Sequence, residues 1–92
     1  MANKRDIKKE IKSYTDELIE DAFIESINGD EKEAKKMDEI IDEIIDYRYD
    51  LLSRVANSPK GNRAKVKEHF RSIRNDLMTK GEEYRKKIGK VG

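Results

Sequence analysis

Residues 37–56, MDEIIDEIIDYRYDLLSRVA, decide the fold class of this 92-residue chain. Apolar side chains recur there at intervals of three and four residues, which is the period of one face of an α-helix. The face is broad, because adjacent apolar residues belong to it: Ile40-Ile41, Ile44-Ile45 and Leu51-Leu52. A face of this width predicts a helix that contacts two neighbours, so we expect a further helix on each side of it in the sequence.

The residues that flank this stretch predict where its helix begins and ends. Asp30 and Glu33 have the spacing of a capping box, which places the start near residue 31. The segment 57–62, Asn-Ser-Pro-Lys-Gly-Asn, ends the helix, because a proline disfavours helical geometry in the residue before it. On the other side, Asn28-Gly29-Asp30 separates the helix from the preceding one.

The first helix is expected over about residues 4–27, with Asn3 as its N-cap. The third begins at residue 62 or 63, and its apolar residues are Val66, Phe70, Ile73, Leu77, Tyr84, Ile88 and Val91. This pattern keeps its phase across Gly81, which favours one helix with a weak point over a break into two helices. Short connections make sequential helices neighbours. We therefore predict an all-α fold, an antiparallel three-helix bundle that forms one domain over residues 1–92.

Composition restricts the functional classes. Charged residues make up 45% of the chain, yet the net charge is only +1, and the helical spacing of the apolar residues argues against disorder. There is no cysteine, which excludes disulfides, thiolate metal sites and thiol nucleophiles. The N-terminal residues are polar and basic, without the apolar run of a signal peptide or membrane helix, so we expect a cytoplasmic protein.

Charge is partitioned along the chain. The net charge is +3 over residues 1–14, −10 over residues 15–50 and +8 over residues 51–92. A hairpin with its turn near Ser58-Pro59 would bring an acidic stripe of the second helix beside a basic stripe of the third. The pairs expected from that register are Asp50–Lys67, Asp46–Arg71 and Glu43–Arg74. Exposed pairs contribute about 0–1 kcal/mol each, so they would set the register more than the stability.

The basic stripe has a second interpretation. Arg63, Lys67, Arg71 and Arg74 could contact the phosphates of a nucleic acid, displacing counterions. Near-neutral net charge and the lack of a recognisable reader motif speak against this interpretation, and the acidic stripe offers the same side chains a partner within the chain. Pairing inside the bundle is therefore the favoured interpretation, and nucleic-acid binding is the alternative.

The aromatic residues suggest a surface for protein interaction. Tyr47 and Tyr49 lie two residues apart and cannot share one helix face, so one of them leaves the core. Phe23 lies beside the apolar stripe of the first helix and adds spare apolar surface. Spare aromatic surface on a small bundle is typical of self-association, such as a homodimer, or of binding to another protein. A single exposed tyrosine without any function is the competing interpretation.

No catalytic, cofactor or metal site is expected. His69 is the only histidine, and no nucleophile and orienting group accompany it in the pattern of a catalytic site. The carboxylates of residues 38–46 are spaced four apart on one helix face, but the Glu-x-x-His motifs of a di-iron bundle are lacking, so we interpret them as a solvated face. We predict a non-enzymatic protein that binds a protein partner or itself.

The N-terminal stretch Met1-Ala2-Asn3-Lys4-Arg5-Asp6-Ile7-Lys8-Lys9, followed by Leu18, Ala22 and the Pro59-Lys60-Gly61 loop, resembles a family of short uncharacterised bacterial helical proteins. The resemblance extends over most of the chain, and its most distinctive part is the start. It implies a helical fold, and it implies no activity, cofactor or site residue.

Overall fold

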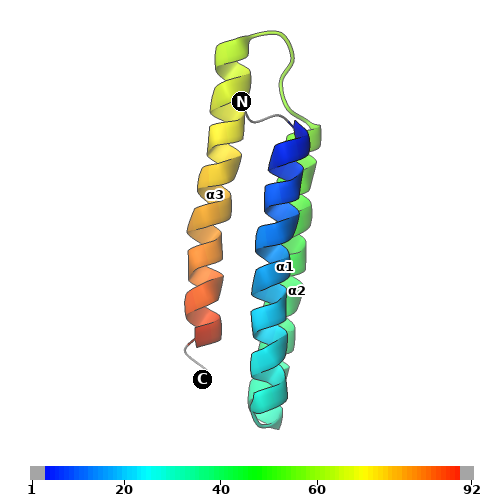
Figure 1. Ribbon diagram of the computed structural model, residues 1–92, viewed down its shortest axis with the longest axis vertical. Helices are drawn as coiled ribbons and strands as arrows, with labels where there is room; N and C mark the ends of the chain where they lie inside the picture. The colour runs from blue at the N-terminus through cyan, green and yellow to red at the C-terminus, as the bar shows by residue number, and fades with distance from the viewer. Residues whose placement is uncertain (1–3, 90–92) are drawn as a thin grey trace.

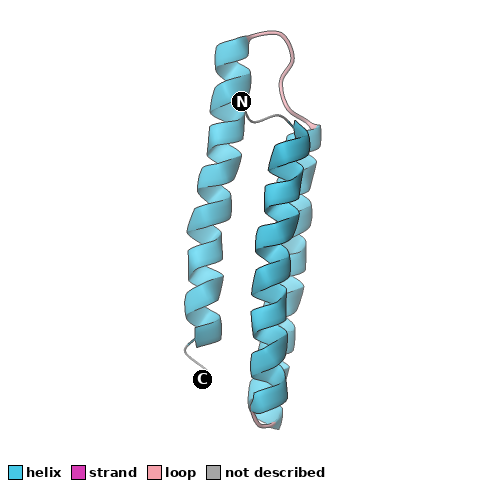
Figure 2. Ribbon diagram, in the orientation of Figure 1, coloured by secondary structure: helices cyan, strands magenta, loops and turns pink. Residues whose placement is uncertain are grey.

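Three helices make up the computed structural model, which describes residues 4–89. Helix α1 spans Lys4–Asn28, α2 spans Glu31–Ala56 and α3 spans Arg63–Gly89. They run antiparallel along one axis and form a rod of 52 × 17 × 16 Å (Figures 1 and 2). The prediction of an all-α three-helix bundle is confirmed, and α3 continues through Gly81 without a break.

The expected N-cap of α2 is present, and Asn57 caps its other end. The Asp30 side chain accepts a hydrogen bond from the backbone N–H of Glu33 at 2.9 Å, and the Asn57 N–H donates to the Ser53 carbonyl at 3.0 Å. In the connection to α3, Gly61 has a φ of +98°, a conformation that favours glycine. The predicted N-cap of α1, Asn3, and the last apolar residue of the predicted stripe, Val91, lie outside the described residues.

The core follows the predicted period on all three helices. Residues three or four apart are buried: Ile7, Ile11, Thr15, Leu18 and Ala22 on α1, Met37, Ile40, Ile44, Tyr47, Leu51 and Val55 on α2, and Ile73, Leu77, Gly81 and Ile88 on α3, where the half-buried Tyr84 completes the spacing. Thr15 is the buried polar residue of the α1 stripe. Its hydroxyl group donates a hydrogen bond to the carbonyl oxygen of Ile11 at 2.7 Å, so it is not left unpaired in the core. The three stripes meet along the axis of the rod.

Helix α3 is covered by its neighbours over only part of its length. The pair α1 and α2 packs most extensively, and α3 contacts each of them less. Buried residues of α3 begin at Ile73, whereas residues 63–72 contain none. Figure 1 shows the reason: the first turns of α3 extend past the end of α2, and the loop 57–62 rises to meet them.

The register between α2 and α3 differs from the predicted one. A tight hairpin centred near Ser58 would place Tyr47 opposite Phe70, but the Tyr47 hydroxyl donates to the backbone carbonyl of Leu77. Seven residues separate those two positions, which is about two turns of helix. The six-residue connection is long enough to let α3 slide along the bundle, and the slide brings Ile73, Leu77 and Ile88 into the core.

The predicted lacing of acidic and basic stripes is wrong. None of its three pairs forms among residues 4–89. Basic residues of α2 and α3 instead pair as Arg48–Asp16 at 2.9 Å, Arg54–Asp76 at 2.6 Å and Arg74–Glu10 at 2.7 Å. Each of these joins two different helices. Surface ion pairs contribute about 1 kcal/mol or less, whereas burying one large apolar side chain contributes about 1.5–3 kcal/mol. Apolar burial therefore sets the register, and the charges adapt to it.

Gly81 is a packing position. It is buried, and a Cβ atom built on it would lie 2.2 Å from Cε1 of Tyr14 on α1. The missing side chain thus leaves room for the tyrosine ring between α1 and α3. The guanidinium carbon of Arg85 lies 5.8 Å from the centroid of the same ring, so the two side chains form a cation–π contact. What the sequence indicated as a weak point of the helix is thus a place where α1 and α3 pack closely.

Candidate functional site

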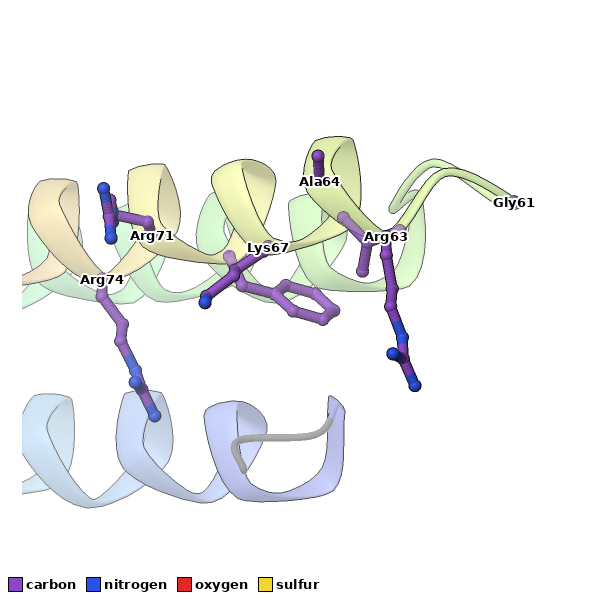
Figure 3. Close-up of a pocket in the computed structure, with 8 residues that line it drawn as sticks. Gly61, Arg63, Ala64, Lys67, Arg71 and Arg74 are labelled. Atoms are coloured by element: carbon purple, nitrogen blue, oxygen red, sulfur yellow. The ribbon is translucent and has the colours of Figure 1, made fainter.

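A groove of about 850 Å³ lies along the first turns of α3. Its lining residues are Gly61, Arg63, Ala64, Val66, Lys67, Phe70, Arg71 and Arg74, and we call it the α3 groove. Figure 3 shows Arg63 and Arg74 extending from α3 toward the side on which α1 lies, with Lys67 between them along the helix. Arg71 and Ala64 lie on the other side of α3 in this view. The groove thus brings together all four basic residues that the sequence suggested as phosphate contacts.

The apolar part of the α3 groove is a continuation of the core. Val66 and Phe70 precede Ile73 and Leu77 at spacings of four, three and four residues, so all four belong to one stripe of α3. The last two are buried, whereas Val66 and Phe70 are half-buried and line the groove. The stripe therefore runs on beyond its buried residues: Phe70 still packs against the edge of the core, and Val66, one turn before it, is only partly covered.

Most of the positive charge in the α3 groove has no carboxylate partner. Arg74 is the exception, since its guanidinium contacts Oε2 of Glu10 on α1 at 2.7 Å and 3.1 Å. Arg63, Lys67 and Arg71 are exposed and form no ion pair within residues 4–89. The apolar stripe is consequently bordered along one side by three cations without an ion-pair partner, which attract negatively charged groups through a largely solvated region.

The opposite side of these turns is fixed to the end of α2. Nε2 of His69 lies 2.8 Å from the carbonyl oxygen of Arg54, one of the last carbonyls of α2, which lack partners within their own helix. The Arg54 side chain in turn donates to Asp76 at 2.6 Å and to Ser72 at 3.3 Å. This network gives His69 a structural role, capping α2 and orienting the groove residues of α3. No periodicity in the sequence indicated that contact, because it depends on the register.

The aromatic candidates separate into buried and exposed residues. Tyr47 is 6% exposed, its ring centroid lies 5.5 Å from that of Tyr84, and burial raises its pKa well above the ordinary value for tyrosine. Tyr47 is thus removed from any interaction surface. Tyr49 is 67% exposed, as expected for a pair of residues that cannot share one face. Burial also raises the pKa of Tyr84, with further contributions from Glu43 and Glu83.

Phe23 is exposed and belongs to an apolar patch near the end of α1. The exposed fractions are 56% for Phe23, 47% for Ile24 and 66% for Ile27, and we call these three residues the α1 patch. The buried stripe of α1 ends at Ala22, so Ile24 and Ile27 lie outside the core. Large apolar side chains grouped on the surface of a small domain are typical of an interaction site.

The described residues form neither a metal site nor a membrane span. No group of three or more His, Asp or Glu side chains between residues 4 and 89 is arranged so that it could hold a metal ion, and this includes the acidic face of α2. Within the same range, no helix is long and apolar enough to cross a membrane. The α3 groove and the α1 patch are therefore the surfaces that we take as candidate functional sites.

Comparison with known proteins adds no further guide to the site. No family model, curated protein or solved structure matches this chain. The resemblance of the chain to short uncharacterised bacterial helical proteins stays a prediction.

Proposed function

We propose that this protein is a non-enzymatic binding module whose α3 groove accepts an acidic amphipathic helix of a protein partner. One observation carries the proposal: the apolar stripe of α3 continues past its buried residues as the partly exposed Phe70 and Val66, beside cations that have no ion-pair partner within residues 4–89. A chain without cysteine has no need of an oxidising compartment, and we extend the proposal to a cytoplasmic protein.

The form of the groove supports a helix as the ligand. A helix laid along α3 would bury its own apolar face on Val66 and Phe70, as a fourth helix of the bundle would. Carboxylates on the edge of that helix would then lie beside Lys67 and Arg71, where opposite charge accelerates encounter and selects the orientation. The apolar centre contributes the binding free energy, and the cations contribute the preference for an acidic partner.

The proposal is tested with a synthetic helical peptide of about five turns that carries Leu on one face and Glu on the other. We expect it to shift the amide NMR signals of residues 61–74 selectively in the full-length ¹⁵N-labelled protein. A peptide with the same Leu residues and Lys in place of Glu is the charge control, and we expect it to leave those signals unchanged. Equal binding of both peptides, or signals that move elsewhere in the bundle, would contradict the proposal.

A matched pair of variants locates the binding site. The double variant Lys67→Glu/Arg71→Glu reverses two charges of the α3 groove, and Lys80→Glu/Lys86→Glu makes the same change at exposed positions of α3 outside it. We expect the first to weaken peptide binding by about tenfold or more and the second by less than about twofold, because charge acts over roughly 10 Å at moderate salt. Circular dichroism confirms that both variants remain helical.

Nucleic-acid binding is the second candidate, and one observation favours it. Arg63, Lys67, Arg71 and Arg74 share the α3 groove, and the acidic stripe of α2 does not neutralise them. Three or four phosphate contacts would give a slope of about −3 to −4 in a plot of log K against log salt concentration for duplex DNA. Fluorescence anisotropy with labelled duplex and single-stranded oligonucleotides measures this slope. No binding at low salt would eliminate this candidate, whereas the peptide experiment is unaffected by it.

A further inference from the structure

We propose that the α3 groove accepts the end of α1 from a second copy of this chain. The α1 patch of one molecule would lie in the groove of the next, so that the molecules associate head to tail. This inference rests on the proposed function, because it names the occupant of the same groove. It goes further by assigning a role to the α1 patch and by fixing the symmetry of the assembly.

The α1 patch already has the form of the required ligand. Phe23 and Ile27 are one turn apart on α1, and Ile24 lies next to them on the same face. At 100° per residue, this face points away from the buried residues Leu18 and Ala22. The patch is therefore the outer side of a helix that its own bundle holds in a folded state, and binding would require no further folding.

The part of α1 that carries the patch is acidic, opposite in charge to the α3 groove, while on one side Arg85 of α3 lines a small pocket with Asp21, Ile24 and Glu25. Between residues 13 and 28, α1 contains five carboxylates and no basic residue. Glu20 lies one turn before Phe23 and Ile24 on the same face, and Glu17 lies one turn before Glu20. Neither carboxylate has an ion-pair partner within residues 4–89, whereas Asp16 contacts Arg48. An apolar face bordered by free carboxylates thus matches an apolar groove bordered by free cations.

The two surfaces lie at opposite ends of the molecule. Figure 1 shows the end of α1 and the first turns of α3 at the two ends of the rod, which is 52 Å long. One molecule cannot bring its own patch into its own groove, so the contact has to form between two molecules. Because the surfaces are different, the contact is heterologous, and a pair of bound molecules still has one open groove and one open patch. The assembly grows as a chain or closes as a ring.

The contact is expected to be small. The interface would join three exposed apolar side chains to a groove lined by Val66 and Phe70. The total surface area that it buries is therefore expected to lie at the low end of known interfaces, below about 1,200 Å². We therefore expect reversible association with a dissociation constant of about 10 µM to 1 mM. Added salt should weaken the association, because it screens the attraction between the carboxylates of one molecule and the cations of the other.

Sedimentation velocity of the full-length protein over a range of concentrations tests the inference. We expect the weight-average mass to rise with concentration and to fall toward that of a monomer when the salt concentration is raised. A protein that remains monomeric up to about millimolar concentration, at low salt, would overturn the inference.

Complementation distinguishes a head-to-tail contact from a symmetric one. The variant Phe23→Gln/Ile27→Gln removes the patch and keeps the groove, and Lys67→Glu/Arg71→Glu does the opposite. Each variant alone is expected to be monomeric, whereas an equimolar mixture is expected to form a dimer that grows no further, because one intact groove meets one intact patch. A mixture that stays monomeric, or variants that associate like the wild type, would refute the proposed contact.

The control for the patch variant is Tyr49→Gln/Met78→Gln, which removes two exposed apolar side chains outside both surfaces. We expect it to associate like the wild type, and a loss equal to that of the patch variant would show nonspecific apolar association. The synthetic acidic peptide separates this inference from the proposed function. Peptide binding to a protein that does not self-associate refutes the second copy alone, and self-association unchanged by the groove variant refutes the use of the groove.

Discussion

Two regions of α3 carry the same apolar sequence pattern but differ in how deeply their apolar side chains are buried. Residues 73–88 place Ile73, Leu77 and Ile88 in the core, whereas residues 63–72 carry Val66 and Phe70 on the same stripe and leave them half-buried in an open groove. The difference shows that apolar periodicity predicts a helix and which of its faces is apolar. It does not predict that a neighbour is present to cover that face.

The largest contrast between the two regions is expected from side-chain truncation. Ile73→Ala should lower the free energy of unfolding by about 2–5 kcal/mol, because a fully buried isoleucine leaves a cavity. Val66→Ala, on the same stripe, should cost less than about 1 kcal/mol, since its side chain is half-exposed and leaves no cavity. Urea unfolding measures both. Equal costs would show that residues 63–72 are covered in solution as fully as residues 73–88.

A second prediction concerns Gly81, where local and tertiary effects have opposite signs. Helix propensity alone predicts that Gly81→Ala stabilises the protein by about 1 kcal/mol. We expect a loss of about 1–3 kcal/mol, because the new methyl group would meet the ring of Tyr14. In a Tyr14→Ala background the same change should become stabilising. If Gly81→Ala stabilises the wild type as well, the ring moves aside freely and the packing between α1 and α3 is loose.

A third prediction uses the pKa of Tyr47 in the packed region. Burial favours the neutral phenol and raises its pKa from 10.0 in the folded state, with a smaller rise for Tyr84. A pKa raised by folding adds stability that is complete below the unfolded pKa and is lost as pH rises beyond it. The melting temperature should therefore fall above about pH 10, and by less in Tyr47→Phe.

At neutral pH, Tyr47→Phe itself should cost about 0.5–1.5 kcal/mol, because it removes one hydrogen bond to the Leu77 carbonyl. Tyr49→Phe is the matched control, since that hydroxyl is on an exposed side chain. An alkaline loss of melting temperature that is the same in the wild type and in Tyr47→Phe would contradict the assignment to Tyr47.

The smallest effect is expected at the ion pair that ties the open region to α1. Glu10→Gln should change the free energy of unfolding by less than about 1 kcal/mol, because Glu10 and Arg74 are about half exposed. The same change frees Arg74 for a ligand, so binding of the acidic peptide to the α3 groove should become tighter by a few fold. A loss of stability above about 2 kcal/mol would show that this pair, and not apolar burial, sets the position of α3.

The register separates what a single sequence can predict from what it cannot. The N-cap Asp30, the breaks at Gly29 and Pro59 and the stripes of all three helices were predictable, because each depends on residues within one or two turns. The pairing of Lys67 and Arg71 with the acidic stripe was not, because it depends on how far α3 slides past α2. A difference of two turns alters both which charges meet and which apolar residues of α3 the other helices cover.

The candidate sites divide in the same way. Phe23, Tyr49 and the four basic residues of α3 were identified from the sequence, and all six are exposed. The assembly of Arg63, Lys67, Arg71 and Arg74 with Val66 and Phe70 into one groove required the structure, as did the exposure of Ile24 and Ile27 beside Phe23. Tyr47 was assigned to the surface as readily as Tyr49, because spacing shows that one of them leaves the core and not which one.

The sequence by itself determined three antiparallel helices, their boundaries and the uneven division of charge among them, because helix formation, capping and turn geometry are local. The tertiary structure decided the register of α3, the fit of Tyr14 against Gly81 and the cations left without partners. Those features depend on contacts between residues distant in sequence, where burial of a few large apolar side chains outweighs surface ion pairs. The α3 groove is a consequence of that balance.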